Sequence, residues 1–453
     1  MQNLMVLEAN EISPKVFKRF AERRPGSAVA AMFERGRFIE TQATDVPAAD
    51  LYPSQTWASM NTGRPFGEHR VYWYNDQKRY ADFYWHQVAQ KRSAVLVNTL
   101  HSSPLHEYVD SGRFDLVIPD CFAADDSTKP ASYEPFQHLN RTLVQRNGRR
   151  SFVVDTLLSS AKAFIQAPQP GRWGLGGRSV QDVTKLLSAA VRGEREQLRA
   201  AQFPLLAQIF VEAIRKSKPG LAVLFTNHVA AMQHRYWYAL FPQDYPNALY
   251  PNEWVERHGN AILSAMDLLD RWLALLMRMA VELDYTILIT TSMGQAANTR
   301  LSRAVTEVGR HWVVRDPDAL MAGLDPGQDD SPEVEGAMAP QYTYRYASAD
   351  AAAAAKSRID ALRAVGLDLR CETSGPKLTV TVDAHAPEIQ LGNRLLQASE
   401  LGFTEVDVDD HHSGRHDPAG SMFVFNDRSG VFERLDGEVD YLAVAPIIKN
   451  AWG

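Results

Sequence analysis

The chain has 453 residues, of which 45% are hydrophobic and 23% are charged, and its formal net charge is −6 at pH 7. These values describe a soluble globular protein with enough sequence for a large core, and the acidic balance argues against a nucleic-acid-binding surface. The two cysteines, Cys121 and Cys371, lie far apart, which argues against a disulfide framework or a thiolate metal site. Unpaired thiols suit a reducing compartment, so we expect a cytoplasmic protein.

The N-terminal stretch "MQNLMVLEANEIS" lacks the basic start and the longer apolar segment of a signal peptide. The most apolar predicted helix spans residues 261–283. It is interrupted by four charged residues, Asp267, Asp270, Arg271 and Arg278. Because charges are costly inside a bilayer, we expect no membrane span.

The first predicted strand lies in "NLMVLEANEI" (residues 3–12). Alternation along this strand places Glu8 and Asn10 on one face at the expected mouth of a site, with Glu11 beside them. The following residues, 13–24, have the apolar spacing and the capping residues of a helix. The chain is therefore predicted to begin with a strand and a helix.

Strands and long helices alternate along much of the remaining chain. Predicted strands occupy residues 93–99, 114–119, 221–227, 285–291 and 421–426, and predicted helices occupy about 77–90, 178–216 and 254–283. This alternation predicts an α/β fold with a mainly parallel central sheet and helices on both of its faces.

One segment departs from this alternation. Residues 341–385 have the pattern of a β-α-β-β unit, formed by "QYTYRYA", an alanine-rich helix at about 349–364, "LDLRCET" and "KLTVTVDA". We predict a small α+β subdomain here, inserted into a main domain that comprises residues 1–325 and 386–453.

The stretch "YPSQTWASMNTGRPFGEHRVYWYND" (residues 52–76) has a distinctive set of polar residues. It resembles the "W-x-S-x-x-T-G-x-x-P-x-E-H-G" segment of the alkaline phosphatase superfamily, in the type I phosphodiesterase and nucleotide pyrophosphatase branch. The matching residues are Trp57, Ser59, Thr62, Gly63, Gly67, Glu68 and His69.

Four further segments resemble the same family in the same order along the chain. They are "FYWHQVAQKRSAVLVNT", "LFTNHVAAMQHRYW", "MDLLDRWLALL" with "YTILITTSMG", and "SGRHDPAGSMFVF". The resemblance implies an alkaline-phosphatase-like fold. It also implies chemistry in which two metal ions flank a serine or threonine nucleophile and neutralise the phosphate oxygens.

The residues that this chemistry needs are only partly present. Asn10 stands where the family has an aspartate, and Ala230 replaces the aspartate four residues before the retained His234. Ser292 and Met293 replace the aspartate and histidine that follow the strand in "YTILITTSMG". By this resemblance, one of the two metal sites has no charged ligand.

The position of the nucleophile is also changed. An ungapped reading places Pro53 there, with Ser54 and Thr56 as the neighbouring hydroxyl groups. The late histidine of the family is kept as His416. The resemblance therefore predicts a degenerate site that does not work as a two-metal hydrolase.

Polar residues at the strand ends are candidates for a rebuilt site. We predict His234 or His228 as a general acid or base, Glu8 as the group that orients a histidine, and Ser54 or Thr56 as a catalytic hydroxyl. The predicted ligand-binding residues are Asn10, Gln55, Trp57, Asn227, Arg235 and Arg415. Such a set could bind a phosphorylated or sugar-like ligand.

Structural alternatives exist for three of these residues. Glu8 could cap backbone amides or pair with Arg415, because a buried carboxylate needs a partner. Trp57 could be a core aromatic, and His228 could be a hydrogen-bonded structural histidine. These alternatives remain open at the level of sequence.

A single metal site is also conceivable. His234 and His416 could hold one divalent ion, Zn or Mn, if Glu8 completes a set of two histidines and one carboxylate. Without a carboxylate, two imidazoles alone would bind a divalent ion weakly.

Two functions therefore remain. The first is an enzyme of the alkaline phosphatase superfamily, a hydrolase or transferase acting on a small-molecule or glycan phosphate. The second is a pseudoenzyme that binds a phosphorylated ligand or a protein partner. The combination of "E-x-N-E-I" with "T-N-H…H-R-Y-W" is similar to superfamily members associated with bacterial surface-polysaccharide production. The sequence does not predict an oligomeric state.

Overall fold

The computed structural model describes residues 2–145 except 73, 75, 77 and 124, residues 176–299, 310–326, 332–338 and 341–407, and residues 412–453 except 434 and 436. The chain divides into two compact units. The larger unit comprises Met1–Pro246, Asn252–Thr299 and His412–Gly453, and the smaller unit comprises Asn247–Pro251 and Arg300–His411.

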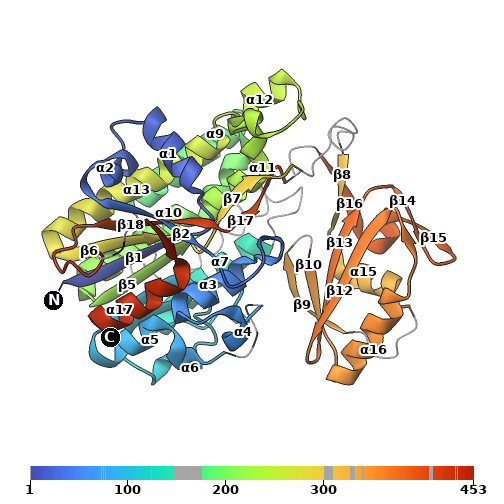
Figure 1. Cartoon of the computed structure of the whole chain (residues 1–453), viewed down its shortest axis with the longest axis horizontal. Coiled ribbons are helices and arrows are strands. Elements are labelled where there is room, and N and C mark those ends of the chain that lie inside the picture. The colour runs from blue at the N-terminus through green and yellow to red at the C-terminus, as the bar shows by residue number, and fades with distance from the viewer. Residues whose placement is uncertain are drawn as a thin grey trace. The chain divides into compact units, whose positions relative to one another are not determined.

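The larger unit is built on an eight-stranded sheet with the order β19-β2-β18-β6-β1-β5-β3-β4 (Figure 1). Its strands are β1 (Asn3–Ala9), β2 (Arg37–Gln42), β3 (Ala94–Thr99), β4 (Phe114–Pro119), β5 (Leu221–Thr226), β6 (Tyr285–Thr290), β18 (Ala419–Phe425) and β19 (Glu438–Asp440). Strands β6, β1, β5, β3 and β4 are parallel, whereas β18 is antiparallel to β6 and β2. The predicted mainly parallel sheet is confirmed.

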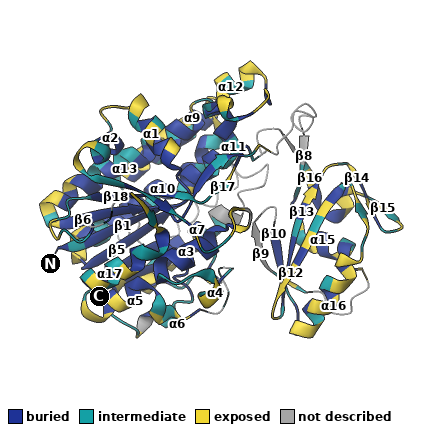
Figure 2. Cartoon of the chain, viewed as in Figure 1, coloured by how far each residue is buried: buried dark blue, intermediate teal, exposed yellow. Residues whose placement is uncertain are grey.

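Helices cover both faces of this sheet. On one face, Leu4 and Val6 share a core with Trp57, Tyr84 and Ile448. These three side chains come from helices α3 (Pro53–Thr62), α5 (Tyr84–Lys91) and α17 (Val444–Trp452). On the other face lie α1 (Pro14–Arg23), α2 (Ala28–Arg35), α10 (Gln202–Ser217) and α13 (Ala261–Leu283). The central strands β1, β3, β5 and β6 are buried along almost their whole length (Figure 2).

Further helices and strands complete the larger unit. They are α4 (Phe66–His69), α6 (His106–Val109), α7 (Glu134–Gln145), α9 (Gly177–Val191), α11 (His228–Leu240), α12 (Asn252–His258), β7 (Gly294–Ala297) and β17 (Gly414–Asp417). The single helix predicted at 178–216 is two helices, α9 and α10, with a 3-10 turn between them. Strand β2 was not predicted, because its alternation of polar and apolar residues is weak.

The smaller unit contains the predicted β-α-β-β segment, formed by β10 (Gln341–Arg345), α16 (Ala349–Asp360), β12 (Leu367–Ser374) and β13 (Lys377–Ala384). Its sheet has the order β16-β8-β13-β10-β9 with β12 beside β13, and it includes β8 (Arg310–Val314), β9 (Glu333–Met338) and β16 (Phe403–Asp407). A second sheet joins β11 (Ala364–Val365), β14 (Glu388–Leu391) and β15 (Arg394–Gln397), and α15 (Pro317–Leu324) packs in the core.

The smaller unit is longer at both ends than the insertion expected at residues 341–385. The reason is the pairing of β8 with β16, which adds residues on both sides of the β-α-β-β segment to one sheet. Local patterns of apolar residues do not reveal this pairing, because the two strands are far apart in sequence.

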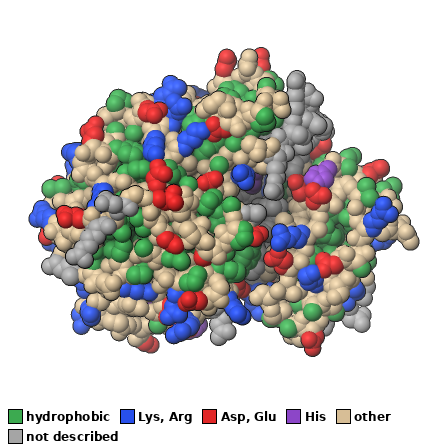
Figure 3. Space-filling view, viewed as in Figure 1, with side chains coloured by type: hydrophobic (Ala, Val, Ile, Leu, Met, Phe, Trp, Pro, Cys, Tyr) green, Lys and Arg blue, Asp and Glu red, His purple; other side chains and the backbone are tan. Residues whose placement is uncertain are grey.

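Acidic and basic side chains are interspersed on the face of the molecule that Figure 3 shows. Among the described residues, no helix combines the length and apolar character needed to cross a membrane. Both cysteines are buried and unpaired.

Glu8 lies inside the core of the larger unit, and the expectation that it lies at the mouth of a site is corrected. Its side chain is fully buried on the face of β1 that also carries Leu4 and Val6. Asn61 Nδ2 donates a hydrogen bond to Glu8 Oε1 over 2.8 Å, and Glu8 Oε2 has no hydrogen-bond partner within the described part of the chain. Burial raises the pKa of Glu8 to about 8, although the Asn61 hydrogen bond acts in the opposite direction.

We expect Glu8→Gln to remove a pH dependence of stability. Because the folded state raises the pKa of Glu8 from 4.5 to about 8, the protonated form stabilises the fold below about pH 4.5, and this contribution is lost as the pH rises through 8. The free energy of unfolding of the wild type should therefore fall by a few kcal/mol relative to Glu8→Gln between about pH 5 and pH 9. Urea denaturation of both proteins at pH 5 and pH 9 measures this difference. The same change in the free energy of unfolding for the wild type and for Glu8→Gln would contradict the prediction.

Candidate metal centre

The carboxyl ends of the parallel strands β1, β5 and β6 lie at one edge of the sheet. Glu11 follows β1, and His234 lies on α11, which follows β5. Strand β7 follows β6 and pairs with β17, so that Gln295 lies opposite His416. Three segments that are far apart in the sequence therefore place Glu11, His234 and His416 at the same edge.

These three side chains make direct contacts. Glu11 Oε2 lies 2.8 Å from His234 Nε2 and 3.4 Å from His416 Nε2. One potential ligand atom from each residue lies within 4.8 Å of the other two. The Glu11 side chain is 3% exposed, whereas the side chains of His234 and His416 are 19% and 24% exposed. We call these three residues the Glu11 triad.

Backbone carbonyl groups determine which ring nitrogen of each histidine carries a proton. His234 Nδ1 donates to Gly414 O over 3.2 Å, and His416 Nδ1 donates to Leu51 O over 2.9 Å. In the neutral rings, each Nε2 therefore presents a lone pair toward Glu11. A lone pair and a carboxylate oxygen repel each other at 2.8 Å unless a proton or a metal cation lies between them.

Glu11 is held firmly in position. Its backbone adopts a left-handed conformation with φ of 53°, which turns its side chain away from the direction that strand alternation would give. Asn10 Nδ2 donates to Glu11 Oε1 over 2.8 Å, and Gln295 Nε2 donates to Glu11 Oε2 over 2.5 Å. Gln233 Nε2 donates to the Glu11 backbone carbonyl over 2.8 Å. Both carboxylate oxygens and the backbone are thus oriented before any ligand binds.

The ionisation of the triad reflects these contacts. Burial alone would raise the pKa of Glu11, but the charges of His416 and His234 and their hydrogen bonds outweigh it and leave this pKa well below its usual value. Burial disfavours a charged His416, yet the Glu11 carboxylate raises the pKa of His416 above its usual value. Glu11 is therefore ionised, as a metal ligand must be.

The donor set fits a divalent metal. A carboxylate and two imidazole nitrogens suit Zn, Mn or Fe. Histidines that bind metals usually donate the other ring N–H to a carbonyl or carboxylate, as both triad histidines do here. The ring of His412 lies 5.1 Å from the ring of His234, between centroids, and adds a further imidazole beside the set.

The structure brings together two of the three predicted ligands. His234 and His416 converge as expected, and Glu11 takes the place that was assigned to Glu8. Strand alternation favoured Glu8 because it assumes an extended backbone, which ends before Glu11. The signal that could have identified Glu11 is its position directly after the strand, next to Asn10.

Three of the predicted ligand-binding residues support the carboxylate of Glu11. Asn10 Nδ2 donates to Asn227 Oδ1 over 2.7 Å, and Trp57 Nε1 donates to Asn10 Oδ1 over 2.7 Å. Trp57 is fully buried with its ring against Phe225, as the core alternative predicted. These contacts fix the Asn10 amide with its N–H groups directed at Glu11 and Asn227.

The hydroxyl groups near the expected nucleophile position contact other groups of the chain. Thr56 Oγ1 lies 2.8 Å from Ser292 Oγ, and Ser54 Oγ donates to the backbone carbonyl of Tyr72. Both residues are fully buried on the first turn of α3. Gln55, between them, is also fully buried.

The other predicted residues point elsewhere. His228 Nδ1 lies 2.7 Å from Thr226 Oγ1, its Nε2 lies 3.2 Å from Ala265 O, and burial lowers its pKa to about 3. This arrangement matches the structural alternative for His228. Arg235 donates to Ala231 O within its own helix, and Arg415 donates to Ala297 O. A catalytic or binding role of these residues remains a prediction.

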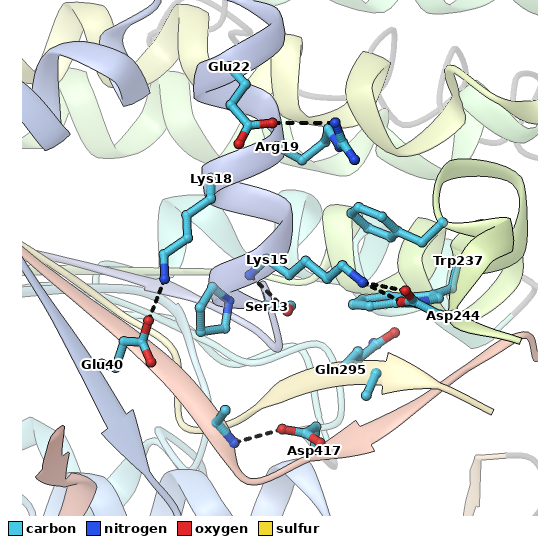
Figure 4. A pocket seen from close by; sticks show the side chains of 14 residues that line it. Ser13, Lys15, Lys18, Arg19, Glu22, Glu40, Trp237, Asp244, Gln295 and Asp417 are labelled. Carbon is cyan, nitrogen blue, oxygen red and sulfur yellow. Dashed lines mark hydrogen bonds and ion pairs between the residues drawn. The ribbon is translucent and has the colours of Figure 1, made fainter. Parts of the chain in front are cut away.

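An open groove of about 550 Å³ adjoins this edge of the sheet (Figure 4). Its cations are paired: Lys15 contacts Asp244 at 2.5 Å and Lys18 contacts Glu40 at 2.6 Å. Gln295 lines the groove and also donates to Glu11. The groove therefore extends to a side chain that positions the triad.

Comparison with known proteins gives matches to solved structures only, since no family model and no curated protein matches the chain. A phosphonoacetate hydrolase from Sinorhizobium meliloti, solved with phosphonoacetate, is 13% identical with a TM-score of 0.41, and the match covers 99% of this chain and 95% of that one. Murine ectonucleotide pyrophosphatase/phosphodiesterase 5 is 9% identical with a TM-score of 0.40, over 100% and 95%. The alkaline phosphatase PafA is 12% identical with a TM-score of 0.43, over 98% and 94%.

With TM-scores below 0.5, these likenesses carry no conclusion about the reaction of this chain. They include the two protein classes that the sequence motifs resemble, alkaline phosphatases and nucleotide pyrophosphatase/phosphodiesterases. The chain has the mainly parallel α/β fold expected from those motifs, and the solved structures similar to it include alkaline phosphatases.

Proposed function

We propose that this chain is a metal-dependent enzyme that acts on a small-molecule or glycan phosphate through one divalent cation held by Glu11, His234 and His416. The observation that supports this proposal most directly is the convergence of two imidazole Nε2 atoms on Glu11 Oε2, at 2.8 and 3.4 Å. The family resemblance of the sequence motifs suggests that the substrate carries a phosphate group.

Each part of the triad has a defined role in this proposal. A divalent cation supplies positive charge that polarises a phosphate oxygen. Glu11, fixed by Asn10 and Gln295, and the two histidines, fixed by their Nδ1–H bonds, hold that charge at one point. The side chains of His234 and His416 are 19% and 24% exposed, which leaves the site accessible to a ligand.

The reaction is hydrolysis or transfer to an acceptor molecule. The Ser54 hydroxyl donates a hydrogen bond to the Tyr72 carbonyl, and the Thr56 hydroxyl is hydrogen-bonded to Ser292 Oγ. Because both hydroxyls are engaged in this way, we favour an acceptor from solution over a covalent intermediate on the chain. Two buried free thiols support a cytoplasmic location for this reaction.

A second candidate function is binding of a phosphorylated ligand or a protein partner without turnover. The observation that favours it is the buried Thr56–Ser292 hydroxyl pair. Ser292 stands where the family resemblance expects a carboxylate ligand, and Pro53, near Thr56, stands where it expects the nucleophile. Measurements of metal binding and of turnover distinguish the two functions.

We expect the purified full chain to bind one Zn²⁺ or Mn²⁺ per molecule in isothermal titration calorimetry. Glu11→Gln and His416→Ala should each weaken this binding at least about tenfold, since even outer-shell changes reach that size. His138→Ala is the matched control, because His138 is an exposed histidine that contacts a carboxylate at 2.8 Å elsewhere on the unit. Unchanged affinity in Glu11→Gln would show that the metal binds somewhere else.

With added Zn²⁺ or Mn²⁺, we expect turnover of bis(p-nitrophenyl) phosphate or p-nitrophenyl phosphate. Glu11→Gln should lower kcat/KM at least about a hundredfold, because the cation and its position are both lost. His138→Ala should retain the wild-type rate. Metal binding without turnover of either ester would favour the second candidate function.

Thr56→Ala tests the identity of the acceptor. If the acceptor comes from solution, this variant should keep kcat within about fivefold of the wild type, since the Thr56 hydroxyl contacts only Ser292 Oγ and Pro53 O among the described hydrogen bonds. A loss of several orders of magnitude, with folding intact by circular dichroism, would instead identify Thr56 as the nucleophile.

A further inference from the structure

A second group of buried polar side chains lies at the same edge of the sheet as the triad. His101 and Asp120 follow the ends of β3 and β4, and Gln55 lies in the first turn of α3. All three residues have no exposed surface. We call them the His101 cluster.

Four side-chain atoms of the His101 cluster have no hydrogen-bond partner among the residues that the structure describes. They are His101 Nδ1, Asp120 Oδ2, Gln55 Nε2 and Gln55 Oε1. A buried polar atom without a partner destabilises the fold, because it loses its hydrogen bonds to water. Such a concentration of unmade hydrogen bonds needs a group that completes them, either water or part of a ligand.

The hydrogen-bonding character of each atom is defined. His101 Nε2 donates to the Ser54 carbonyl over 2.6 Å, and burial lowers the pKa of His101 well below its usual value. The ring is therefore neutral, and Nδ1 is an acceptor. Asp120 Oδ1 accepts from the Phe122 N–H over 2.9 Å, and Oδ2 is a further acceptor. With Gln55 Oε1, the cluster offers three acceptors and the N–H₂ donor of Gln55.

The three acceptors and the single N–H₂ group indicate which kind of ligand the cluster can bind. A phosphate group brings acceptors only, and Asp120 would repel it. A second metal cation is disfavoured because the positive charge of Lys78 already acts on both Asp120 and His101. Burial raises the pKa of Asp120 to about 6 in spite of this charge, whereas burial and the charge of Lys78 both lower the pKa of His101. Hydroxyl groups both donate and accept, and they satisfy such a set without adding charge.

An aromatic side chain lies beside the cluster, and a short backbone segment connects the cluster with the triad. The ring of Tyr74 lies 5.9 Å from that of His101 and stacks on Phe122 at 4.1 Å, between centroids. This ring offers a flat apolar wall beside the polar atoms. The backbone of residues 51–54 links the two sites, because Ser54 O accepts from His101 Nε2 over 2.6 Å and Leu51 O accepts from His416 Nδ1 over 2.9 Å.

We propose that the His101 cluster binds hydroxyl groups of a sugar or another polyol, as the part of the substrate that lies next to the phosphate. Gln55, His101 and Asp120 then determine specificity rather than carry out the reaction. The position of the phosphate at the Glu11 triad rests on the proposed function, whereas the choice of hydroxyl groups rests on the cluster alone.

The test compares ligands with and without hydroxyl groups on the Zn²⁺-loaded full chain. Isothermal titration calorimetry measures the affinity for inorganic phosphate, phenyl phosphate, glycerol 3-phosphate and the 1-phosphates of glucose, galactose and mannose. We expect at least one hydroxyl-bearing ester to bind tenfold or more tightly than phenyl phosphate. Asp120→Asn and Gln55→Leu should reduce this preference to threefold or less, with the affinity for inorganic phosphate unchanged.

A second measurement separates this inference from the proposed function. Saturation-transfer NMR with the neutral sugars glucose, galactose, mannose and N-acetylglucosamine needs neither metal nor phosphate. Signals that disappear in Asp120→Asn would support the cluster even if no phosphate compound binds. Equal affinities for phenyl phosphate and all hydroxyl-bearing esters, with no sugar signal, would overturn it, as would a preference that survives in both folded variants.

Discussion

The geometry of the candidate site depends on the buried carboxylate of Glu11. Taking a carboxylate out of water costs several kcal/mol unless charges and hydrogen bonds offset the loss of hydration. Here two amide donors, from Asn10 and Gln295, and two histidines supply these interactions. The loop after β1 places Asn10 beside the Glu11 carboxylate, and the pairing of β7 with β17 places Gln295 and His416 beside it.

The parallel sheet explains why the partners of Glu11 come from distant parts of the sequence. Parallel strands end at a common edge, so each βα connection contributes one or two side chains to the same region. The triad, its amide supports and the His101 cluster all use this edge. The other ends of the strands carry apolar and structural polar contacts, such as the bond from Tyr285 Oη to Pro219 O.

Much of the fold could be predicted from the sequence, because continuous apolar runs such as Leu221–Thr226 and Tyr285–Thr290 define buried strands locally. Within the site, the order of the motifs identified His234 and His416. The sequence could not distinguish Glu8 from Glu11, since that choice depends on a single left-handed residue at the strand end. The extent of the smaller unit depends on pairing between β8 and β16, which no local pattern encodes.

The anchoring of His416 on the carbonyl of Leu51 joins positions that are 365 residues apart. A metal ion bound by the triad would extend this connection to Glu11 and His234, and would act on the chain as a reversible cross-link. Cross-links that close long loops restrict the unfolded chain most strongly. The segment that carries β17 would then open less often when metal is bound. The metal supply of the cell would therefore affect both the occupancy of the site and the rate at which the larger unit unfolds.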